Sequence, residues 1–230
     1  MVDVEREGPV ARIFLNRPEK ANALTSRALD ELERALRELA GDRSLRTVIL
    51  GGRGRTFCGG ADREELSNLT AQTAGAFVTR IHEVCQAIRE LPVPVVARLH
   101  GAVIGAGLEV AAACDLRVAA EGTRFAMPEV RLGIPSVVEA ALLPRLMGSG
   151  RAAWLVLTGE AIDARRALEW GLIEDLASDL DSRLESLSKS LLAGDPEALR
   201  VQKQLLQLWD EAPLASAVAA SIERFARVHK

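Results

Sequence analysis

Two glycine-bearing segments of the sequence contain residue types suited to holding an anion. Residues 57–62 (FCGGAD) and 101–115 (GAVIGAGLEVAAACD) each place small residues after a buried strand and just before a helix. Glycine and alanine let a ligand approach the backbone, and N–H groups at a helix start carry partial positive charge. Two such groups aimed at one point would form an oxyanion hole, which stabilises an enolate made from a thioester. Either segment alone could also be an ordinary strand–helix turn.

Two glutamates stand near these segments. Glu109 comes three residues after Ala106, so on a helix its carboxylate returns to the face of the Ala106 N–H. It lies in an apolar helix, where an acid is either paired or functional, although the helix dipole alone also favours acids in a first turn. Glu129 follows Pro128 and could equally be an exposed loop residue. Together the two carboxylates could serve as a general acid–base pair.

The elements that must position these residues alternate along the first part of the chain. The patterns predict strands at residues 10–15, 47–50, 95–99 and 116–119. They predict helices from Thr25 or Ser26 to residue 40, and over 71–89, 105–113, 196–208 and 213–228. From Ser136 onward the chain is expected to be mostly helical. This order indicates an α/β core followed by a helical C-terminal region.

Composition narrows the class of protein. The chain has 230 residues, of which 48% are hydrophobic and 27% charged, as in globular proteins. A net charge of −3 disfavours a nucleic-acid partner. Cys58, Cys85 and Cys114 show neither metal-ligand nor disulfide spacing, and we expect buried free thiols and no metal. No signal peptide or membrane-length apolar run is present, so the sequence predicts a cytoplasmic protein with no membrane partner.

Five blocks together carry a resemblance. They occur in this order along most of the chain: NRPEKANAL (16–24), FCGGAD (57–62), HGAVIGAGLEVAAACDLRVA (100–119), FAMPEVRLGIP (125–135) and LTGEAIDARRALEWGLI (157–173). The set resembles the successive signature blocks of the crotonase (enoyl-CoA hydratase/isomerase) superfamily. Five ordered blocks are far more specific than any one of them.

The resemblance implies an architecture and a substrate. The fold would be α/β, a crotonase-like spiral of ββα units with a helical C-terminal region. Residues 1–175 would form the core with an acyl-CoA site. Residues 176–230 would form a helical region for oligomerisation or lid formation, shorter than is usual for the family. The partners implied are an acyl-CoA substrate and identical subunits in a homotrimer or dimer of trimers. No cofactor is implied, because coenzyme A is part of the substrate.

The resemblance also implies roles for particular residues. The oxyanion hole would be made by the backbone N–H groups of Ala61 and Ala106, although the family usually has glycine at the second position. Glu109 and Glu129 would hold a water for hydration of a trans-2-enoyl-CoA, with Glu129 protonating the α-carbon and Glu109 helping to activate the water. Further residues would contact the coenzyme or substrate, namely Lys20, Ala21, Leu24, Gly60, Asp62, Gly105 and Glu139.

One segment departs from the family pattern. Residues 136–139 read SVVE where typical hydratases have a glycine-rich stretch. Glu139 could be a third acid near the acyl chain, or it could form a salt bridge or a helix cap. Val137 and Val138 could reshape the acyl pocket. The departure keeps another enolate-forming acyl-CoA enzyme open, such as a double-bond isomerase, racemase or decarboxylase. A non-catalytic binding protein on the same fold is a third reading.

Overall fold

The strands form two sheets in the computed structural model, which describes residues 1–228; the last two residues of the predicted helical region lie outside it. The larger sheet has the order β1-β2-β3-β4-β6-β9, with β1 antiparallel to β2 and the other neighbours parallel. The smaller sheet has the order β5-β7-β8. The strands are β1 (Val2–Glu7), β2 (Val10–Leu15), β3 (Thr47–Gly52), β4 (Val95–Leu99), β5 (Ala102–Ile104), β6 (Leu116–Ala120), β7 (Arg124–Ala126), β8 (Ile162–Asp163) and β9 (Asp175–Ala177).

Helices cover both faces of the larger sheet and form most of the second half of the described chain. The α-helices are α1 (Ser26–Ala40), α2 (Arg63–Asn68), α3 (Ala74–Glu90), α4 (Ala106–Ala113), α5 (Leu143–Met147), α6 (Ser149–Thr158), α7 (Ala164–Trp170), α8 (Leu180–Ala193), α9 (Pro196–Glu211) and α10 (Leu214–Val228). Short 3-10 helices are η1 (Pro18–Lys20), η2 (Glu129–Leu132) and η3 (Val138–Leu142). The Thr25 side chain caps α1 by accepting a hydrogen bond of 3.1 Å from the Ala28 N–H.

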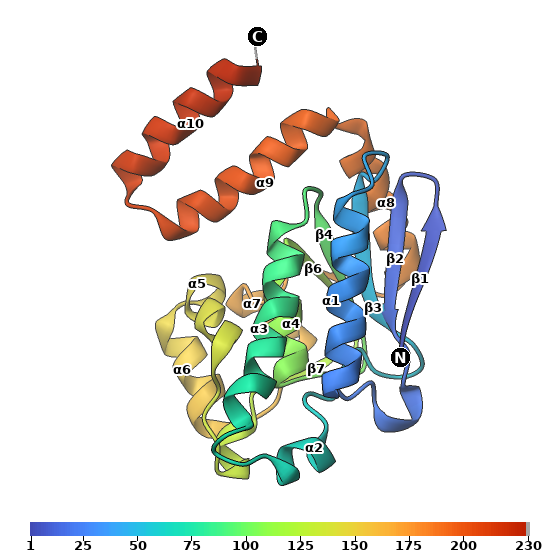
Figure 1. Cartoon of the computed structure of the whole chain (residues 1–230), viewed down its shortest axis with the longest axis vertical. Helices are drawn as coiled ribbons and strands as arrows, with labels where there is room; N and C mark the ends of the chain where they lie inside the picture. The colour runs from blue at the N-terminus through green and yellow to red at the C-terminus, as the bar shows by residue number, and fades with distance from the viewer. Residues whose placement is uncertain (229–230) are drawn as a thin grey trace.

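The core has two parts because side chains alternate across the sheet. In β3, Leu50 belongs to the large core with leucines of α1 and other apolar side chains of α3, whereas Ile49 belongs to a smaller core against α8. Both side chains are fully buried. Figure 1 shows α1 and α3 side by side on one face of the sheet. Burial of each such side chain contributes about 1.5–3 kcal/mol, so the sheet and these helices form a rigid base for the loops at their ends.

The chain spirals because β3, β4 and β6 of the larger sheet are each followed by a short strand or bridge. After β3, Cys58 pairs in parallel with Val103 of β5. After β4 comes β5, and after β6 comes β7, which pairs in parallel with β5. A helix then follows in each turn of the chain, with α2 and α3 after the first and α4 after the second. The predicted spiral of ββα units is confirmed.

The predicted elements are present with small shifts, but several others were missed. The helix predicted over residues 71–89 begins at Ala74, and α2 precedes it as a separate helix. Five strands were not predicted, namely β1, β5, β7, β8 and β9. Strand β1 is mostly exposed and has no apolar alternation, and the other four are two or three residues long. Such short strands form only because neighbouring segments offer hydrogen-bond partners.

The last two helices extend away from the body of the molecule. In Figure 1, α9 crosses the upper end and α10 lies outermost, packed against α9. Helix α9 is anchored by buried Lys203, whose Nζ lies 2.8 Å from Asp115 Oδ2 and donates to the carbonyls of Ile88 and Val93. An ammonium with these three partners meets the requirement that a buried charge be paired.

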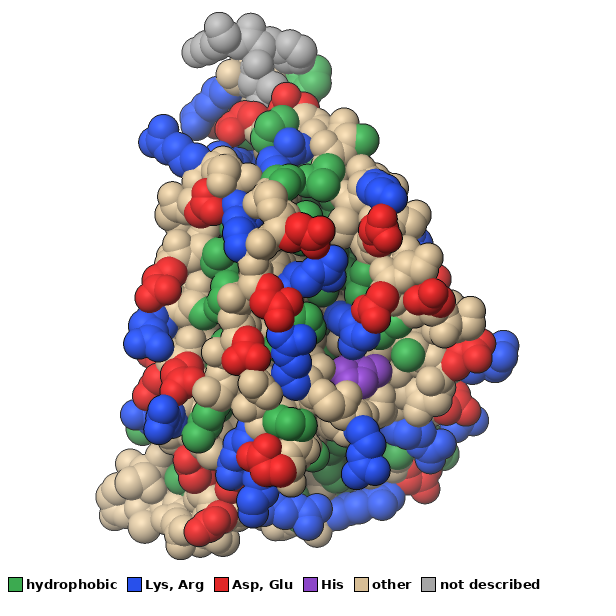
Figure 2. Space-filling model, turned by 90° about the vertical axis from the view of Figure 1, so that its right-hand side faces the viewer, with side chains coloured by type: hydrophobic (Ala, Val, Ile, Leu, Met, Phe, Trp, Pro, Cys, Tyr) green, Lys and Arg blue, Asp and Glu red, His purple; other side chains and the backbone are tan. Residues whose placement is uncertain are grey.

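The surface carries both signs of charge. Figure 2 shows acidic and basic side chains interspersed on one face, with basic ones more frequent toward its lower end. Within residues 1–228, the helices are too short or too polar to cross a membrane.

Candidate active site

The two small-residue segments lie against each other. The Cys58 N–H donates to the Ala102 carbonyl (3.0 Å), and the Ile104 N–H donates to the Cys58 carbonyl (3.0 Å). A β-carbon on Gly60, whose φ is +97°, would lie 3.0 Å from the Ile104 carbonyl oxygen. A β-carbon on Gly107 would lie only 2.6 Å from Cys58 Cβ. A side chain at Gly60 or Gly107 would push the two segments apart, so glycine is needed at both positions.

Ala61 and Ala106, whose backbone amides are the predicted donors, both line one pocket of about 110 Å³, here called the acid pocket. Within residues 1–228 neither amide donates a hydrogen bond. Ala106 is the first residue of α4, where the helix leaves the N–H without an internal partner. The acid pocket is lined by Gly59, Gly60, Ala61, Arg63, Leu66, Phe77, Val78, Ile81, Ile104, Gly105, Ala106, Glu109, Pro128, Glu129, Leu132, Ile134, Pro135 and Val137. Two free donors in one pocket are what an oxyanion hole requires.

Backbone hydrogen bonds from Leu24 hold the segment that contains Ala61. The Leu24 N–H donates to the Gly60 carbonyl (2.8 Å), and the Leu24 carbonyl accepts from the Asp62 N–H (2.9 Å). Its side chain is fully buried and does not line the pockets described in this section. The predicted binding residue Leu24 is thus placed as a support of the Ala61 amide.

Asn22 is a positioning residue that sequence reasoning missed. Its side-chain oxygen accepts from the Arg17 N–H (2.8 Å), and its amide donates to the carbonyls of Arg53 (2.9 Å) and Thr56 (2.7 Å). Asn22 has φ +55°, in the left-handed region that asparagine tolerates better than most residues. An asparagine in a short block of small residues was the available signal. Its three bonds tie this block to the loop that leads into Cys58.

Glu109 and Glu129 also line the acid pocket. Glu109 projects from α4 and is buried, and its Oε1 accepts a hydrogen bond of 3.2 Å from the Ala140 N–H. Glu129 begins η2, and its Oε2 accepts a hydrogen bond of 3.0 Å from the Ser136 hydroxyl. Both predicted acids therefore lie in the same pocket as the two predicted amide donors.

The two acids titrate differently from free glutamates. Burial raises the pKa of Glu109 to about 8, and the negative charge of Glu129 acts in the same direction. Burial also raises the pKa of Glu129, whereas its own backbone N–H and the Ser136 hydroxyl lower it. A pair of interacting carboxyls that shares one proton provides one neutral and one ionised group. One neutral and one ionised carboxyl form a general acid–base pair.

Glu139 lies outside the lining of the acid pocket. It is buried, and its Oε1 lies 2.8 Å from Nδ1 of the half-exposed His82. Its Oε2 has no hydrogen-bond partner among the described residues. The preceding residue, Val138, has φ +39°, which is rare for a β-branched side chain. Of the three roles considered from sequence, this placement matches the salt bridge, and not a helix cap or a direct contact with an acyl chain in the acid pocket.

Several predicted binding residues line a neighbouring pocket of about 460 Å³, here called the Lys20 pocket. Its lining consists of Lys20, Ala21, Ala23, Gly59, Ala61, Asp62, Arg63 and Glu64. It shares Ala61 with the acid pocket. Within the described residues the Lys20 ammonium makes no ion pair, but Arg17 lies 2.5 Å from Asp62, and this hydrogen bond lowers the pKa of Asp62. Asp62 also caps α2, so it is held by structural contacts.

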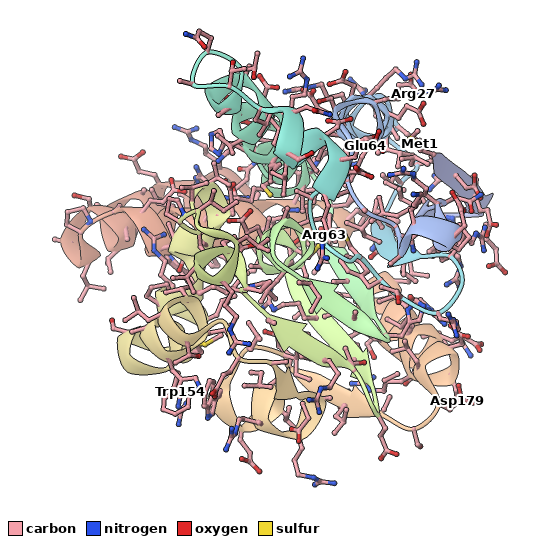
Figure 3. All side chains as sticks on the ribbon, turned by 90° about the horizontal axis from the view of Figure 1, so that it is seen from below. Met1, Arg27, Arg63, Glu64, Trp154 and Asp179 are labelled. Carbon is pink, nitrogen blue, oxygen red and sulfur yellow. The ribbon has the colours of Figure 1, made fainter. Side chains whose placement is uncertain are left out.

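Arg63 is a second residue that sequence reasoning missed. It lines the acid pocket, the Lys20 pocket and a third pocket beside α3, and its guanidinium has no ion-pair partner in residues 1–228. Figure 3 shows Arg63 toward the middle of the lower face, whereas Glu64 lies farther out, near Met1 and Arg27. A cation directly after the helix-capping Asp62 was the only sequence signal.

The third pocket, here called the apolar pocket, continues from the acid pocket and has a volume of about 630 Å³. Its lining is Arg63, Leu66, Ser67, Leu69, Thr70, Ala71, Ala74, Gly75, Val78, Leu132, Ile134, Pro135 and Val137. Val137 of the departing segment lines both pockets, whereas Val138 lines neither. The lining of the apolar pocket is mostly apolar, as in sites that bind apolar groups of a ligand.

Other reactive side chains have structural roles. The three cysteines are free and buried, as predicted, and burial raises the pKa of Cys58 to about 12. His100 makes structural hydrogen bonds, with its ring nitrogens 3.0 Å from the Gly54 carbonyl oxygen and 3.2 Å from Arg98 Nη1. Among the described residues, no cluster of three or more His, Cys, Asp or Glu side chains could hold a metal ion.

Comparison with known proteins identifies the family to which this fold and site belong. A family model described as enoyl-CoA hydratase/isomerase matches residues 5–229. The chain belongs to this family, the crotonase superfamily, and the resemblance carried by the five sequence blocks is confirmed.

Individual relatives cover nearly the whole chain. The short-chain-enoyl-CoA hydratase of Clostridium acetobutylicum is 33% identical over 228 residues, which is 97% of this chain and 87% of that protein. The crotonyl-CoA hydratase of Syntrophomonas wolfei is 33% identical over 204 residues, 87% of this chain and 78% of that protein. A crystal structure of an enoyl-CoA hydratase from Bacillus anthracis matches with a TM-score of 0.95 at 30% identity, covering 100% of this chain and 91% of that one. The fold is therefore the crotonase α/β fold with C-terminal helices.

Proposed function

We propose that the protein is an enoyl-CoA hydratase-like lyase that adds water to a trans-2-enoyl-CoA. The observation that carries this proposal is the meeting of four groups in the acid pocket, namely the amides of Ala61 and Ala106 and the carboxyls of Glu109 and Glu129. Hydration needs a place for negative charge on the thioester oxygen and two acids for the water. Both requirements are met within one small cavity.

In the proposed reaction, the thioester oxygen accepts hydrogen bonds from the amides of Ala61 and Ala106. Ionised Glu129 removes a proton from water while the water oxygen bonds to the β-carbon, and the electron pair of the double bond moves to the thioester oxygen as an enolate. Glu129 then returns the proton to the α-carbon, and the carbonyl re-forms. Neutral Glu109, whose pKa is raised to about 8, holds the water. Water is consumed, one C–O and one C–H bond form, and Glu129 is regenerated.

The neighbouring pockets support the binding of a coenzyme A thioester. Lys20 and Arg63 bring unpaired positive charge to the Lys20 pocket, where phosphate groups could be held. The apolar pocket offers space for the acyl chain next to the two acids. Ala61 lines both the Lys20 pocket and the acid pocket, and the apolar pocket continues from the acid pocket. The thioester would therefore sit at the Ala61 amide, with the coenzyme toward the Lys20 pocket and the acyl chain toward the apolar pocket.

A second candidate reaction is favoured by the segment of residues 136–139. The buried Glu139 carboxylate, with one unpartnered oxygen, follows the strained Val138 where typical family members have glycines. An isomerase, racemase or decarboxylase would use the same enolate but different proton transfers. A non-catalytic binding protein has less support, because two acids with raised pKa values share a pocket with two free amides.

We also propose that the chain assembles into a homotrimer or a dimer of trimers through its C-terminal helical region. Supporting this, α9 and α10 expose large apolar side chains, with Leu214 80% and Ile222 66% exposed, and Trp209 on α9 is 48% exposed. Monomeric proteins rarely leave such a face open. Light scattering of the purified protein tests the assembly, and a monomer at all concentrations would contradict it.

The reaction is tested by incubating the protein with crotonyl-CoA and following loss of the conjugated double bond and formation of 3-hydroxybutyryl-CoA. Glu129→Gln should cost on the order of 10² to 10⁴ in turnover with the fold unchanged. Glu121→Gln, an exposed glutamate outside the pockets, is the matched control. Conversion of 3-enoyl-CoA to 2-enoyl-CoA without hydration would favour the isomerase. Binding of acyl-CoA without any turnover would favour the binding protein.

A further inference from the structure

We propose that Ser136 is a positioning residue that fixes the Glu129 carboxylate for proton transfer. The inference rests on the proposed hydration and assigns a role to a residue outside the four groups that carry it. Ser136 belongs to the segment that departs from the family pattern, and glycine at this position could not supply a side-chain donor. The contact is therefore a property of this chain.

The geometry accounts for both oxygens of Glu129. Its Oε2 lies 3.0 Å from the Ser136 hydroxyl, which must be the donor when the carboxyl is ionised. Its Oε1 lies against Gly105, since a β-carbon there would be only 2.3 Å from this oxygen. Gly105 directly precedes Ala106, whose amide lines the same pocket. One oxygen is thus held by serine while the other is kept beside the amide that would bind the thioester oxygen.

The same short segment also supports the second acid. Five residues span the Ser136 hydroxyl, which donates to Glu129, and the Ala140 N–H, which donates to Glu109 at 3.2 Å. Between them, Val138 adopts φ +39°, a conformation that is strained for a β-branched residue. The turn at Val138 lets both donors of one segment reach carboxyls from two different elements. A strained backbone conformation of this kind persists only where the surrounding contacts hold it in place.

The other charged groups near Glu129 do not hold its carboxylate, so the hydrogen bond from Ser136 matters for its position and its ionisation. Glu109 of α4 and Arg63 of α2 line the same pocket, and Arg63 makes no ion pair within residues 1–228. Arg131, on the same 3-10 helix as Glu129, instead donates to the Thr158 carbonyl. Among the described residues Glu129 makes no ion pair, so the serine hydroxyl is its side-chain hydrogen-bond donor. A hydrogen bond to the ionised form favours that form, and its loss favours protonation.

The experiment compares Ser136→Ala and Ser136→Thr with wild type in crotonyl-CoA hydration, measured from pH 5 to 9. We expect Ser136→Ala to lower kcat about tenfold, with KM within about twofold, because a donor to a charged group is lost. The acid limb of its profile of kcat against pH should move to higher pH by about one unit, because the pKa of Glu129 rises. Ser136→Thr retains the hydroxyl, and the half-buried site borders an open groove with space for a methyl, so it should restore both kcat and the acid limb.

Ser44→Ala is the matched control, since it removes a serine–carboxylate hydrogen bond of 2.6 Å to Asp42 on an exposed loop far from the pocket. It should leave kcat and the pH profile unchanged. Wild-type kcat and an unmoved acid limb in folded Ser136→Ala would overturn the inference while leaving hydration standing. Failure of threonine to rescue would also overturn it. Absence of hydration by the wild-type protein would instead refute the proposed function on which the inference rests.

Discussion

Glu139 Oε1 lies 2.8 Å from His82 Nδ1, and the other oxygen of Glu139 has no partner among the described residues. This acid stands beside the catalytic candidates without lining their pocket. Its charge nevertheless contributes to the raised pKa of Glu109, after burial and the charge of Glu129. Glu139 therefore acts on the site through the electric field and not by contact.

Glu139→Gln should move the alkaline limb of the hydration profile to lower pH. Removing a nearby negative charge makes ionised Glu109 less unfavourable, so the pKa of Glu109, now about 8, should fall. We expect kcat at the optimum to change by less than about threefold, because glutamine keeps a hydrogen bond to His82. The measurement is kcat against pH from 6 to 10. A loss as large as that expected for Glu129→Gln would make Glu139 a third reacting acid instead.

Gly105→Ala should displace Glu129. Gly105 has φ +52°, and the added methyl would lie 2.3 Å from Glu129 Oε1. The carboxylate must swing away, and kcat should fall at least about tenfold, as expected when a proton-transfer group is misplaced. Strain at positive φ should also cost about 1–2 kcal/mol of unfolding free energy.

Gly122→Ala is the control for this strain, since Gly122 has φ +81° and no atom within 4 Å of the added carbon. It should lower the midpoint of thermal unfolding in the same way but leave kcat unchanged. If both variants lose activity equally, backbone strain and not displacement of Glu129 explains the effect.

Glu109→Gln should change the pH dependence of stability. Folding raises the pKa of Glu109 from 4.5 to about 8, so the folded state binds one proton more than the unfolded state between these values. The unfolding free energy of the wild-type protein should therefore fall as pH rises through this window. Glutamine removes that dependence and should be the more stable by a few kcal/mol at pH 9, with little difference at pH 4. Urea unfolding at pH 4, 7 and 9 measures it, and parallel curves for both proteins would contradict the prediction.

Gly75→Leu should shorten the acyl chain that the site accepts. Gly75 lines the apolar pocket, and a β-carbon there would meet no atom within 4 Å. A leucine would fill part of the chamber, so kcat/KM for trans-2-decenoyl-CoA should fall about tenfold or more while that for crotonyl-CoA stays within about twofold. Gly150→Leu, also helical and in open space but outside the three pockets, is the control. Equal losses on both substrates would exclude the apolar pocket as the acyl site.

Local spacing predicted the two anion-holding segments and the place of Glu109, and the family blocks supplied the remaining assignments in the acid pocket. Ala106 opens a helix, and such a position leaves the backbone N–H without an internal partner whatever the distant structure. Ala61 precedes the cap of α2, and its free N–H depends on the bridge to Leu24. Glu109 follows Ala106 by three residues, which returns a side chain to the same helical face. Glu129 came from the family block and not from spacing. The long helices and most of the longer strands were also predictable from local sequence, because the alternation of buried and exposed positions follows from residues close together in the chain.

Other features depended on which distant side chains approach each other, and only the tertiary structure decided them. The Glu139–His82 pair joins residues 57 positions apart, and Leu24 supports Ala61 through a bridge between separate segments. The Ser136 hydroxyl reaches Glu129 only because η2 and the strained turn at Val138 bring that segment back. The sequence by itself determined the chemical groups and the elements that present them. The direction of each carboxylate and its proton affinity were decided by packing, since burial and hydrogen-bond partners come from residues that are remote along the chain.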